Sequence, residues 1–408
     1  MNSESAVRVQ EKTIKILATA QVLSGVGVAG TVAAGSLLVA SITNSETLAG
    51  LTQTFAVLGA AAMALPLSRL TQRGGRRLGL SAGYIFGATG ALLAILGGTN
   101  EILFLMLMGA FMLGAASAAG YQARFAATDL ATGETRSRDL SFVVWGSTVG
   151  AVTGPNLMGP SGNIAELMGF PRLVGPYVIA FVTLTLGTIV IQFFLRPDPY
   201  LTAVNLKDDG KTRTKLLSAR AALKIIRENP RALIGIAAIA IGHVAMVSVM
   251  VMTPLHMAHV DVTLTIIGLV ISIHIAGMYA FSPIVGLLSD KYGRISVIRL
   301  GVIILLLATI VAGTAAADDA FTLGIGLFML GLGWSCTLIA GSTLLSESVE
   351  KEIAPSAQGA SDLLMNLSGA GGGALAGVVI ATLGYGWLCF FAAVPVTVLG
   401  IWSYSKNL

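Results

Sequence analysis

The sequence predicts an all-α integral membrane protein with twelve transmembrane helices in two similar halves and with both termini in the cytoplasm. Of its 408 residues, 55% are hydrophobic and only 11% are charged, and the mean hydropathy is +0.83. A water-soluble globule of this composition would expose large apolar patches. The charged residues gather in short clusters between apolar stretches of roughly 20 residues or more, the length that a helix needs to cross a bilayer. These stretches lack the alternating pattern of barrel strands, so helices are the structure that satisfies the backbone inside lipid.

The apolar stretches form two sets of six. The first set is expected at about 14–42, 47–68, 78–98, 101–123, 140–160 and 174–195, and the second at about 231–254, 264–288, 295–316, 320–345, 358–383 and 385–404. The pattern predicts an N-terminal bundle at about 1–195, a central cytoplasmic loop at about 196–230 and a C-terminal bundle at about 231–408. Within the loop, an amphipathic helix at about 216–229 either rests on the inner membrane surface or only tethers the two halves.

The positions of the basic residues predict the orientation. With both termini inside, every one of the 25 Lys and Arg residues except Arg172 falls in an expected cytoplasmic segment or beside it. Retention of positive charge on the cytoplasmic side is typical of inner-membrane proteins. The net charge of +5 then belongs to a surface that attracts anionic lipid, and nucleic acid is not an expected partner. We therefore expect a multi-pass protein of a bacterial plasma (inner) membrane, present as a monomer.

No cofactor and no metal are expected. Gly25, Gly27 and Gly30 match the letters of a dinucleotide fingerprint, but they lie inside an apolar helix with no strand before it, so close helix packing explains them better. Cys336 and Cys389 lie in expected helices and are interpreted as buried free thiols. Copper binding by Met and His side chains would need a tight ligand motif, which the chain lacks.

The loop after the eighth expected helix carries the most specific motif in the chain. It reads Gly286-Leu287-Leu288-Ser289-Asp290-Lys291-Tyr292-Gly293-Arg294. This stretch resembles the loop signature of the major facilitator superfamily, and the chain as a whole resembles the twelve-helix drug:proton antiporters of that family. The resemblance implies that Asp290 and Arg294 belong to a cytoplasmic charge network that stabilises one conformation. A tight turn rich in positive charge is the alternative interpretation.

The loop after the second expected helix keeps part of the same signature. The basic and glycine positions that it retains are Arg73, Gly75 and Arg76. Ser68 replaces the leading glycine and Gln72 replaces the acid, so the resemblance does not supply a carboxylate for this loop. Asp129 and Glu134 are the acids that could take its place. The resemblance also places Arg136, which follows Glu134 before the fifth helix, among the gating residues.

The fifth expected helix has glycines at a spacing close to the antiporter motif of the same family. They are Gly146, Gly150, Gly154 and Gly159, with Pro155 after the third. Glycines four apart leave a helix face without side chains, and proline permits a kink. The resemblance implies export by antiport with this helix as a pivot, and a generic packing face is the alternative. The family's fourth-helix arginine would fall near Ala110, so Arg124 does not inherit its coupling role.

Acids deep in the expected helices are nearly absent, and Asp362 is the exception. It lies about one turn inside the eleventh helix, with Asn366 one turn further on the same face. A partly desolvated carboxyl there could exchange protons at physiological pH. In the alternative interpretation, Asp362 lies in the first helical turn at the interface and is stabilised by the helix dipole.

The histidines cluster in or between the seventh and eighth expected helices. His243, His256 and His274 are candidates for proton coupling because an imidazole changes charge at about pH 6.5, and His259 lies between the two helices. A structural hydrogen bond to a neighbouring helix is the alternative for each of them. Methionines on the same helices would provide a soft cavity lining or fill the core. They are Met246, Met250 and Met278.

Polar residues of the first half complete the expected cavity. They are Gln21, Gln53, Gln122 and Asn156, although hydrogen bonds between helices would use the same residue types. We expect a secondary transporter that works by alternating access, most of all a proton-coupled exporter of a small, partly apolar organic solute. Uptake of a nutrient such as a vitamin or an organic acid, by symport or uniport, is the runner-up. An enzyme or a receptor is a remote alternative, because the chain carries no zinc-hydrolase motif and no nucleophile elbow.

Overall fold

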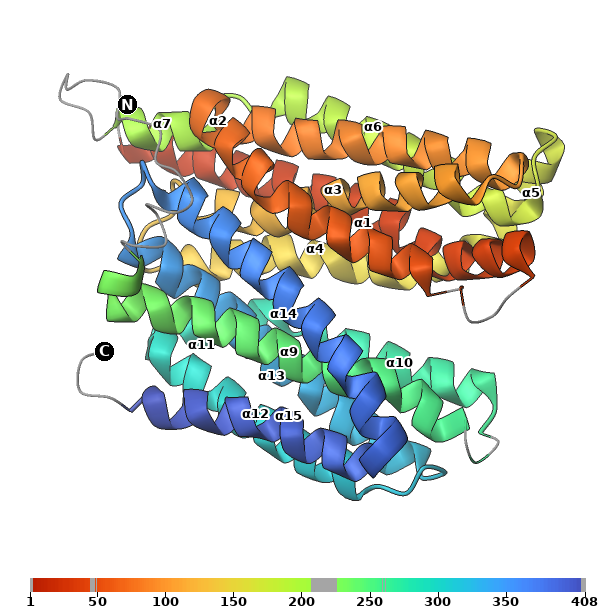
Figure 1. Cartoon of the computed structure of the whole chain (residues 1–408). Helices are drawn as coiled ribbons and strands as arrows, with labels where there is room; N and C mark the ends of the chain where they lie inside the picture. Colours follow the sequence, from red (N-terminus) through yellow and green to blue (C-terminus); the bar gives the residue numbers. More distant parts are fainter. Residues whose placement is uncertain are drawn as a thin grey trace. The chain divides into compact units, whose positions relative to one another are not determined.

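The computed structural model describes residues 3–44, 48, 50–206, 226–258, 260 and 262–404. Regular structure in these ranges is helical throughout, which confirms the predicted all-α fold class (Figure 1). His259 and most of the amphipathic helix expected in the central loop lie outside the described residues.

The helices of the first half follow the predicted ranges closely. Their bounds are α1 (Ser3–Thr43), α2 (Leu51–Thr99), α3 (Leu103–Ala126), α4 (Arg136–Asn156), α5 (Met158–Leu167), α6 (Gly175–Phe194) and α7 (Pro199–Asn205). Two differences are that α2 runs through the loop expected at about 69–77 and that α5 is a separate helix that the sequence does not predict. A third is at α1, which begins well before the first apolar residue of its span. Hydropathy reports only the part of a helix that lies in lipid, and the polar turns around Arg8 and Lys12 continue the same helix outside it.

The helices of the second half also match the prediction. Their bounds are α9 (Pro230–Ala258), α10 (Leu264–Tyr279), α11 (Ser282–Tyr292), α12 (Arg294–Thr314), α13 (Ala320–Ser348), α14 (Ala354–Leu383) and α15 (Tyr385–Trp402). The eighth expected helix is divided into α10 and α11, with Pro283 in the first turn of α11. Proline lacks the N–H that would continue the hydrogen bonding of α10, so the division falls just before it.

Gly75 divides α2 into two membrane crossings. Its φ of 85° and ψ of 176° form a backbone conformation that is essentially restricted to glycine. Within the described ranges, ten helices are long and apolar enough to cross a membrane. Because α2 supplies two crossings, and because the more polar α4 is also long enough at 21 residues, these helices account for the twelve predicted crossings.

Residue contacts divide the chain into two compact units. Unit 1 comprises Met1–Ala131, Gly146–Ala222 and Glu350–Leu363, and unit 2 comprises Thr132–Trp145, Leu223–Val349 and Leu364–Leu408. The start of α4 therefore belongs to unit 2 and the start of α14 to unit 1, while the rest of each helix belongs to the other unit. The bundle boundaries expected from hydropathy, near residues 195 and 230, stay a prediction.

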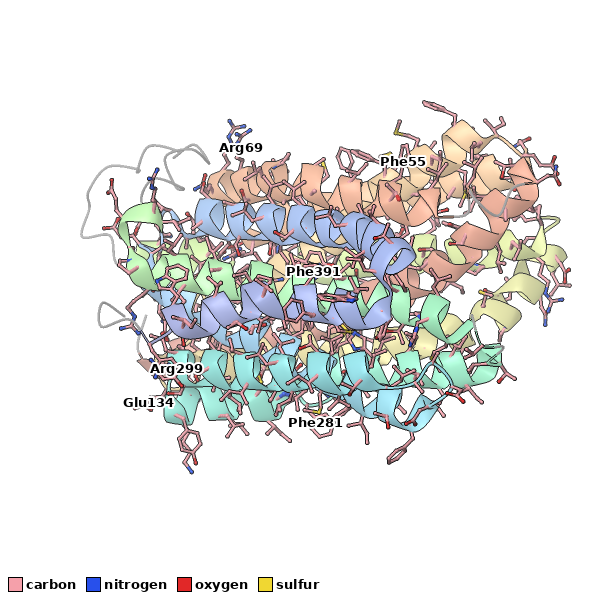
Figure 2. The ribbon with its side chains drawn as sticks, turned by 60° about the horizontal axis from the view of Figure 1, so that its bottom comes forward. Phe55, Arg69, Glu134, Phe281, Arg299 and Phe391 are labelled. Carbon is pink, nitrogen blue, oxygen red and sulfur yellow. The ribbon has the colours of Figure 1, made fainter. Side chains whose placement is uncertain are left out.

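Unit 2 is built around α13. This helix packs against α9, α10 and α12, and 78% of its most apolar stretch is buried. On the outside of the helices, large apolar side chains such as Phe281 and Phe391 are 39% and 44% exposed (Figure 2). Such exposed apolar side chains are expected where the surrounding medium is lipid.

Arg69 of unit 1, at the end of the first crossing of α2, projects away from the helices (Figure 2).

Candidate functional site

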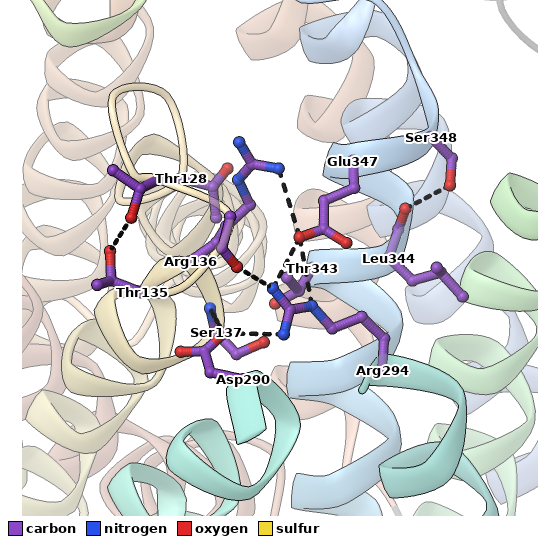
Figure 3. Close-up of polar contacts among 12 residues, drawn as sticks. Thr128, Thr135, Arg136, Ser137, Asp290, Arg294, Thr343, Leu344, Glu347 and Ser348 are labelled. Atoms are coloured by element: carbon purple, nitrogen blue, oxygen red, sulfur yellow. Dashed lines mark hydrogen bonds and ion pairs between the residues drawn. The ribbon is translucent and has the colours of Figure 1, made fainter. Parts of the chain in front are cut away.

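A network of charged residues in unit 2 surrounds the motif loop between α11 and α12. The Asp290 carboxylate accepts hydrogen bonds from the backbone N–H groups of Ser137, at 3.0 Å, and Arg138, at 2.8 Å. These N–H groups belong to the first turn of α4, where the helix dipole also favours a negative charge. Asp290 thus holds the start of α4 against the end of α11, as Figure 3 shows.

Arg294 connects this helix cap to α13. Its guanidinium lies 2.9 Å from the Asp290 carboxylate and 2.8 Å from the Glu347 carboxylate, and it donates to the backbone oxygen of Gly133 at 2.7 Å. Arg136 also lies 3.4 Å from Glu347 (Figure 3). The structure therefore brings together the gating candidates of the second loop, and it adds Glu347 as the acid that they share.

The first motif loop forms a different network in unit 1. Arg76 makes two hydrogen bonds to the Asp129 carboxylate, at 2.7 and 2.9 Å, and a third to Gln358 of α14, at 2.7 Å. Of the two acids that could replace the missing carboxylate, Asp129 is thus the one bound to Arg76. Asp198 accepts from the backbone N–H groups of Arg76 and Arg77. Arg73, in contrast, is exposed.

The two networks are related by an internal repeat. Three residues of the first network have an equivalent in the second, separated by the same difference in residue number. The pairs are Gly75 with Gly293, Arg76 with Arg294, and Asp129 with Glu347. Both glycines have positive φ, 85° and 90°. Each arginine binds an acid near the end of the equivalent helix, α3 or α13.

The replacement of the leading glycine by Ser68 is compensated on the facing helix. In unit 2, a Cβ on Gly286 would collide with Ser141 of α4, and in unit 1, a Cβ on Gly359 of α14 would lie 2.6 Å from Ser68 of α2. Ser141 and Gly359 stand at equivalent positions of the repeat. The glycine and the serine have therefore changed places between the two facing helices, and each pair keeps the close approach.

Arg124 and Asp362 form a deeply buried ion pair in unit 1. The guanidinium Nη2 lies 2.6 Å from Asp362 Oδ1, and the two side chains are only 2% and 0% exposed. The Arg124 guanidinium also lies over the rings of Tyr121 and Phe125. Two charges removed from water in this way are held by each other, and removing one leaves the other uncompensated. This burial differs from the alternative interpretation, in which Asp362 caps a helix at the membrane interface.

Two glycines of α4 lie directly on α1 inside unit 1. A Cβ on Gly150 would collide with the backbone of Gly25, and a Cβ on Gly154 would lie 2.8 Å from the backbone nitrogen of Gly30. Close contact of this kind needs small residues on both helices, and the residues of α1 that face Gly154 are Ala29 and Gly30. We call this contact the α1–α4 seam.

The other members of the glycine motif differ in their relation to the α1–α4 seam. A Cβ on Gly146 would lie 3.0 Å from a backbone oxygen of α1, so this glycine extends the seam. Gly159, expected in the same helix as the other glycines, lies instead in α5, because α4 ends at Asn156. A Cβ on Gly159 would meet nothing within 4 Å, so this glycine has no part in the seam. Pro155 lies within α4.

The three candidate histidines have different environments in unit 2. His274 is completely buried, and its Nδ1 lies 2.7 Å from the backbone oxygen of Leu327, the kind of contact expected of a structural histidine. His256 stacks on Tyr385, with ring centroids 4.3 Å apart. His243 accepts a hydrogen bond from the indole N–H of Trp334 at 3.1 Å. The structure does not bring the three into one site.

The polar candidates of the first half also separate. Gln21 donates to Ser147 of α4 at 2.8 Å, and the buried Gln122 donates to the backbone oxygen of Ala64 at 2.9 Å. Gln53 and Asn156 are exposed. The first two therefore bridge helices in unit 1, and the last two lie on its surface.

The remaining cavity candidates belong to unit 2. Met246, Met278 and Asn366 are buried, at 3%, 7% and 4% exposure, and Met250 is half-buried.

Cysteine and acidic side chains give no sign of a metal site in the described part of the chain. Cys336 and Cys389 are buried free thiols. Among the described residues, no group of three or more His, Cys, Asp or Glu side chains could hold a metal ion.

The sequence alone does not predict several partners in these networks. They are Arg124, Asp198, Glu347, Gln358 and Trp334. A comparison of the two halves can find Glu347, since it is the repeat equivalent of Asp129. The pairing of Arg124 with Asp362 joins residues 238 positions apart, and no local pattern in the sequence indicates it.

Known proteins resemble this chain over nearly its whole length. The family model of the Major Facilitator Superfamily matches residues 17–263 and 244–406. The uncharacterized MFS-type transporters YddS and YdeG of Bacillus subtilis are each 34% identical, over 96% and 97% of this chain and 90% and 93% of their own. The riboflavin transporter RfnT of Brucella anthropi is 25% identical over 93% of this chain and 92% of its own.

Solved structures agree on the fold. The fucose:proton symporter FucP of E. coli has a TM-score of 0.72 at 16% identity, with 96% of this chain and 97% of that chain covered. The human organic anion transporter MFSD10 has a TM-score of 0.74 at 13% identity, with 97% and 99% covered. Together with the family model and the Bacillus relatives, these likenesses show that the chain belongs to the Major Facilitator Superfamily, and that it is a secondary transporter and not an enzyme.

Proposed function

We propose that this protein exports a small organic solute across a bacterial inner membrane in exchange for protons, with both termini in the cytoplasm. The observation that carries the proposal is the buried pair of Arg124 and Asp362, with 2.6 Å between the charged atoms. Asp362 is an acid inside a membrane-spanning helix, and ionisable residues in such positions commonly serve proton relays.

Protonation of Asp362 would uncouple the pair. A neutral carboxyl no longer balances the Arg124 charge, so the interaction that holds the start of α14 in unit 1 weakens. Release of the proton restores the pair. The protonation state of one carboxyl thereby biases the position of α14, and a proton can be exchanged for solute in each cycle.

The charge networks around the two motif loops support a gating role. Asp290 holds the start of α4 in unit 2, and Arg76 holds the start of α14 in unit 1 through Gln358. We propose that both networks lie on the cytoplasmic side, where the basic residues are expected, and that they form in one conformation of the cycle and separate in the other.

Uptake is the second candidate. It is favoured by the relative RfnT, a riboflavin transporter that is 25% identical over 93% of this chain. In that case the solute would be a vitamin or a similar nutrient, and Asp362 would couple proton entry to solute entry. Export is favoured by the α1–α4 seam, at which Gly150 and Gly154 lie directly on the backbone of α1, because these glycines belong to the motif that resembles the antiporter pattern.

Proteoliposomes distinguish these directions. A solute is first selected by its stabilisation of the purified protein in a thermal-shift screen, and its flux is then measured under pH gradients of both signs. Antiport predicts accumulation in vesicles that are acidic inside, because internal protons leave as solute enters. Symport predicts accumulation when the outside is acidic. Flux that is equal under both gradients would contradict proton coupling altogether.

A further inference from the structure

Three aromatic side chains of unit 2 meet near the middle of their membrane-spanning stretches. The indole N–H of Trp334 donates to His243 Nδ1 at 3.1 Å, and their ring centroids lie 6.2 Å apart. Tyr279 meets Trp334 edge to face, with centroids 5.7 Å apart and an angle of 86°. The rings come from α9, α13 and α10, and each lies near the middle of its membrane-spanning stretch.

The internal repeat shows that these rings are a departure from the first half. The repeat that makes Arg76 equivalent to Arg294 also gives each ring an equivalent position in the first half. The equivalents of His243, Tyr279 and Trp334 are Gly25, Ala61 and Ala116. All three equivalent positions of the first half therefore carry glycine or alanine. A packing requirement common to both halves would not explain three simultaneous exchanges of a small residue for a ring.

The helix that faces the imidazole carries a glycine at the point of contact. In unit 1, Gly25 lies against Gly150 of α4, and in unit 2, His243 lies against Gly369 of α14. A Cβ on Gly369 would lie only 2.7 Å from the ring carbon Cδ2 and 2.8 Å from Nε2 of His243. The space that α14 leaves is therefore occupied by the ring and is not available to a side chain at position 369.

The hydrogen bond from Trp334 fixes the tautomer of His243. An indole N–H can only donate, so the Nδ1 that receives it carries no proton. The imidazole is therefore neutral, with its proton on Nε2. Trp334 is 2% exposed, whereas His243 and Tyr279 are half-buried. The cluster thus combines one fixed ring with two rings that retain accessible surface.

The segments that carry the rings hold soft methionine side chains and no charged residue. Met246 and Met250 follow His243 on the same helix, and no Asp, Glu, Lys or Arg lies within two helical turns of any of the three rings along the chain. A charged solute group would find no counter-charge on these segments, and methionine adapts to varied apolar shapes. Edge-to-face and stacked contacts with the rings favour a flat aromatic partner instead.

We propose that His243, Tyr279 and Trp334 form a subsite that takes the planar, uncharged heteroaromatic ring system of the transported solute. The inference rests on the proposed transport function and names the chemical class of the solute. Tyr279 supplies a face or an edge for the ring system. His243, held neutral by Trp334, adds a second flat ring that is polar but carries no charge.

Binding to the purified full-length protein tests the proposal. Riboflavin and lumichrome serve as probes with the ring system, and ribitol and D-xylose as probes without it, with affinity read from ligand-dependent thermal stabilisation. The variant Tyr279→Ala restores the residue type of the first half, and Tyr279→Phe keeps the ring. Trp387→Ala is the matched control, because Trp387 also packs edge to face, on Phe390, but is 53% exposed on α15.

We expect the ring probes to bind the wild type, Tyr279→Phe and Trp387→Ala equally, and to bind Tyr279→Ala about five- to tenfold more weakly. Tyr279→Leu replaces Tyr279→Ala if the smaller residue prevents folding. Ring probes that do not bind, that bind Tyr279→Ala or Tyr279→Leu as tightly as the wild type, or that bind no better than ribitol would overturn the subsite. The proposed proton coupling would survive that result if another solute still responds to a pH gradient in proteoliposomes.

Discussion

Two ion pairs of unit 1 show how burial changes the contribution of a single residue. Glu166 and Arg172 are 3.7 Å apart and more than half exposed, and such a surface pair contributes about 0–1 kcal/mol. Arg124 and Asp362 are almost fully buried at 2.6 Å, and breaking a buried pair by removing one partner costs about 3–5 kcal/mol. The effect of a charge-removing substitution therefore depends on where the pair lies.

Replacement of Asp362 tests the buried pair directly. Asp362→Asn keeps the shape of the side chain but leaves the Arg124 charge uncompensated, and Arg124→Gln leaves the carboxylate uncompensated. We expect each single variant to lose about 3–5 kcal/mol of stability, and the double variant to lose less than either, because it buries no charge. Thermal unfolding of the purified proteins measures this. Losses that simply add in the double variant would contradict a coupled pair, and Glu166→Gln is the exposed control.

The two glycines of positive φ in the motif loops allow a second test on single residues. Gly75 has φ 85° and a Cβ there would collide with the Asp198 carboxylate, whereas Gly293 has φ 90° and a Cβ there would meet nothing within 4 Å. Alanine at either position carries backbone strain of about 1–3 kcal/mol, and only Gly75→Ala adds a collision. We therefore expect Gly75→Ala to lower the unfolding temperature more than Gly293→Ala. Equal effects would show that Asp198 does not restrict this loop.

Among the helices, α4 and α14 differ from the rest because the boundary between the two units falls within them. The boundary follows Trp145 in α4, directly before Gly146, and Leu363 in α14, where the first glycine that follows is Gly369. Both helices continue into glycines, and glycine lowers the cost of bending a helix. Such bending would fit the proposal that the charge networks at the starts of α4 and α14 form and separate during transport.

The α1–α4 seam provides a prediction about helix packing. A leucine at position 150 would have to occupy the space of the Gly25 backbone, whereas the Cβ of one at position 159 would meet nothing within 4 Å. We expect Gly150→Leu to destabilise the protein by about 1–3 kcal/mol, as overpacking does, and Gly159→Leu to leave the unfolding temperature unchanged. If both variants unfold like the wild type, the seam is not closely packed in the membrane.

For the chain as a whole, the sequence predicts the helices better than their contacts. Apolar length and charge clusters report on the bilayer itself, so the predicted helix ranges are close to those observed. Asp362 is conspicuous as an acid in a span, but its partner Arg124 is not, because their contact depends on how distant helices pack. The chemistry of His274 makes it a coupling candidate, yet its contact with the backbone oxygen of Leu327 fits a structural role, which residue type alone does not reveal.

The predicted orientation in the membrane can be tested by labelling. If the motif loops are cytoplasmic, a cysteine placed at Lys291, an exposed position directly after Asp290, should react with a membrane-impermeant maleimide only after the cells are opened. The buried Cys336 and Cys389 should stay unlabelled and serve as the background. Labelling of Lys291→Cys in intact cells would place the loop outside and reverse the proposed topology.

Proton movement driven by the solute tests the role of the buried pair in coupling. Wild-type protein and Asp362→Asn are reconstituted into proteoliposomes that contain a pH-sensitive dye, and a solute that binds both proteins is added. We predict that the solute changes the internal pH only with the wild type, while Asp362→Asn still exchanges labelled for unlabelled solute. Proton movement of equal size in both proteins would show that the pair of Arg124 and Asp362 does not couple transport to protons.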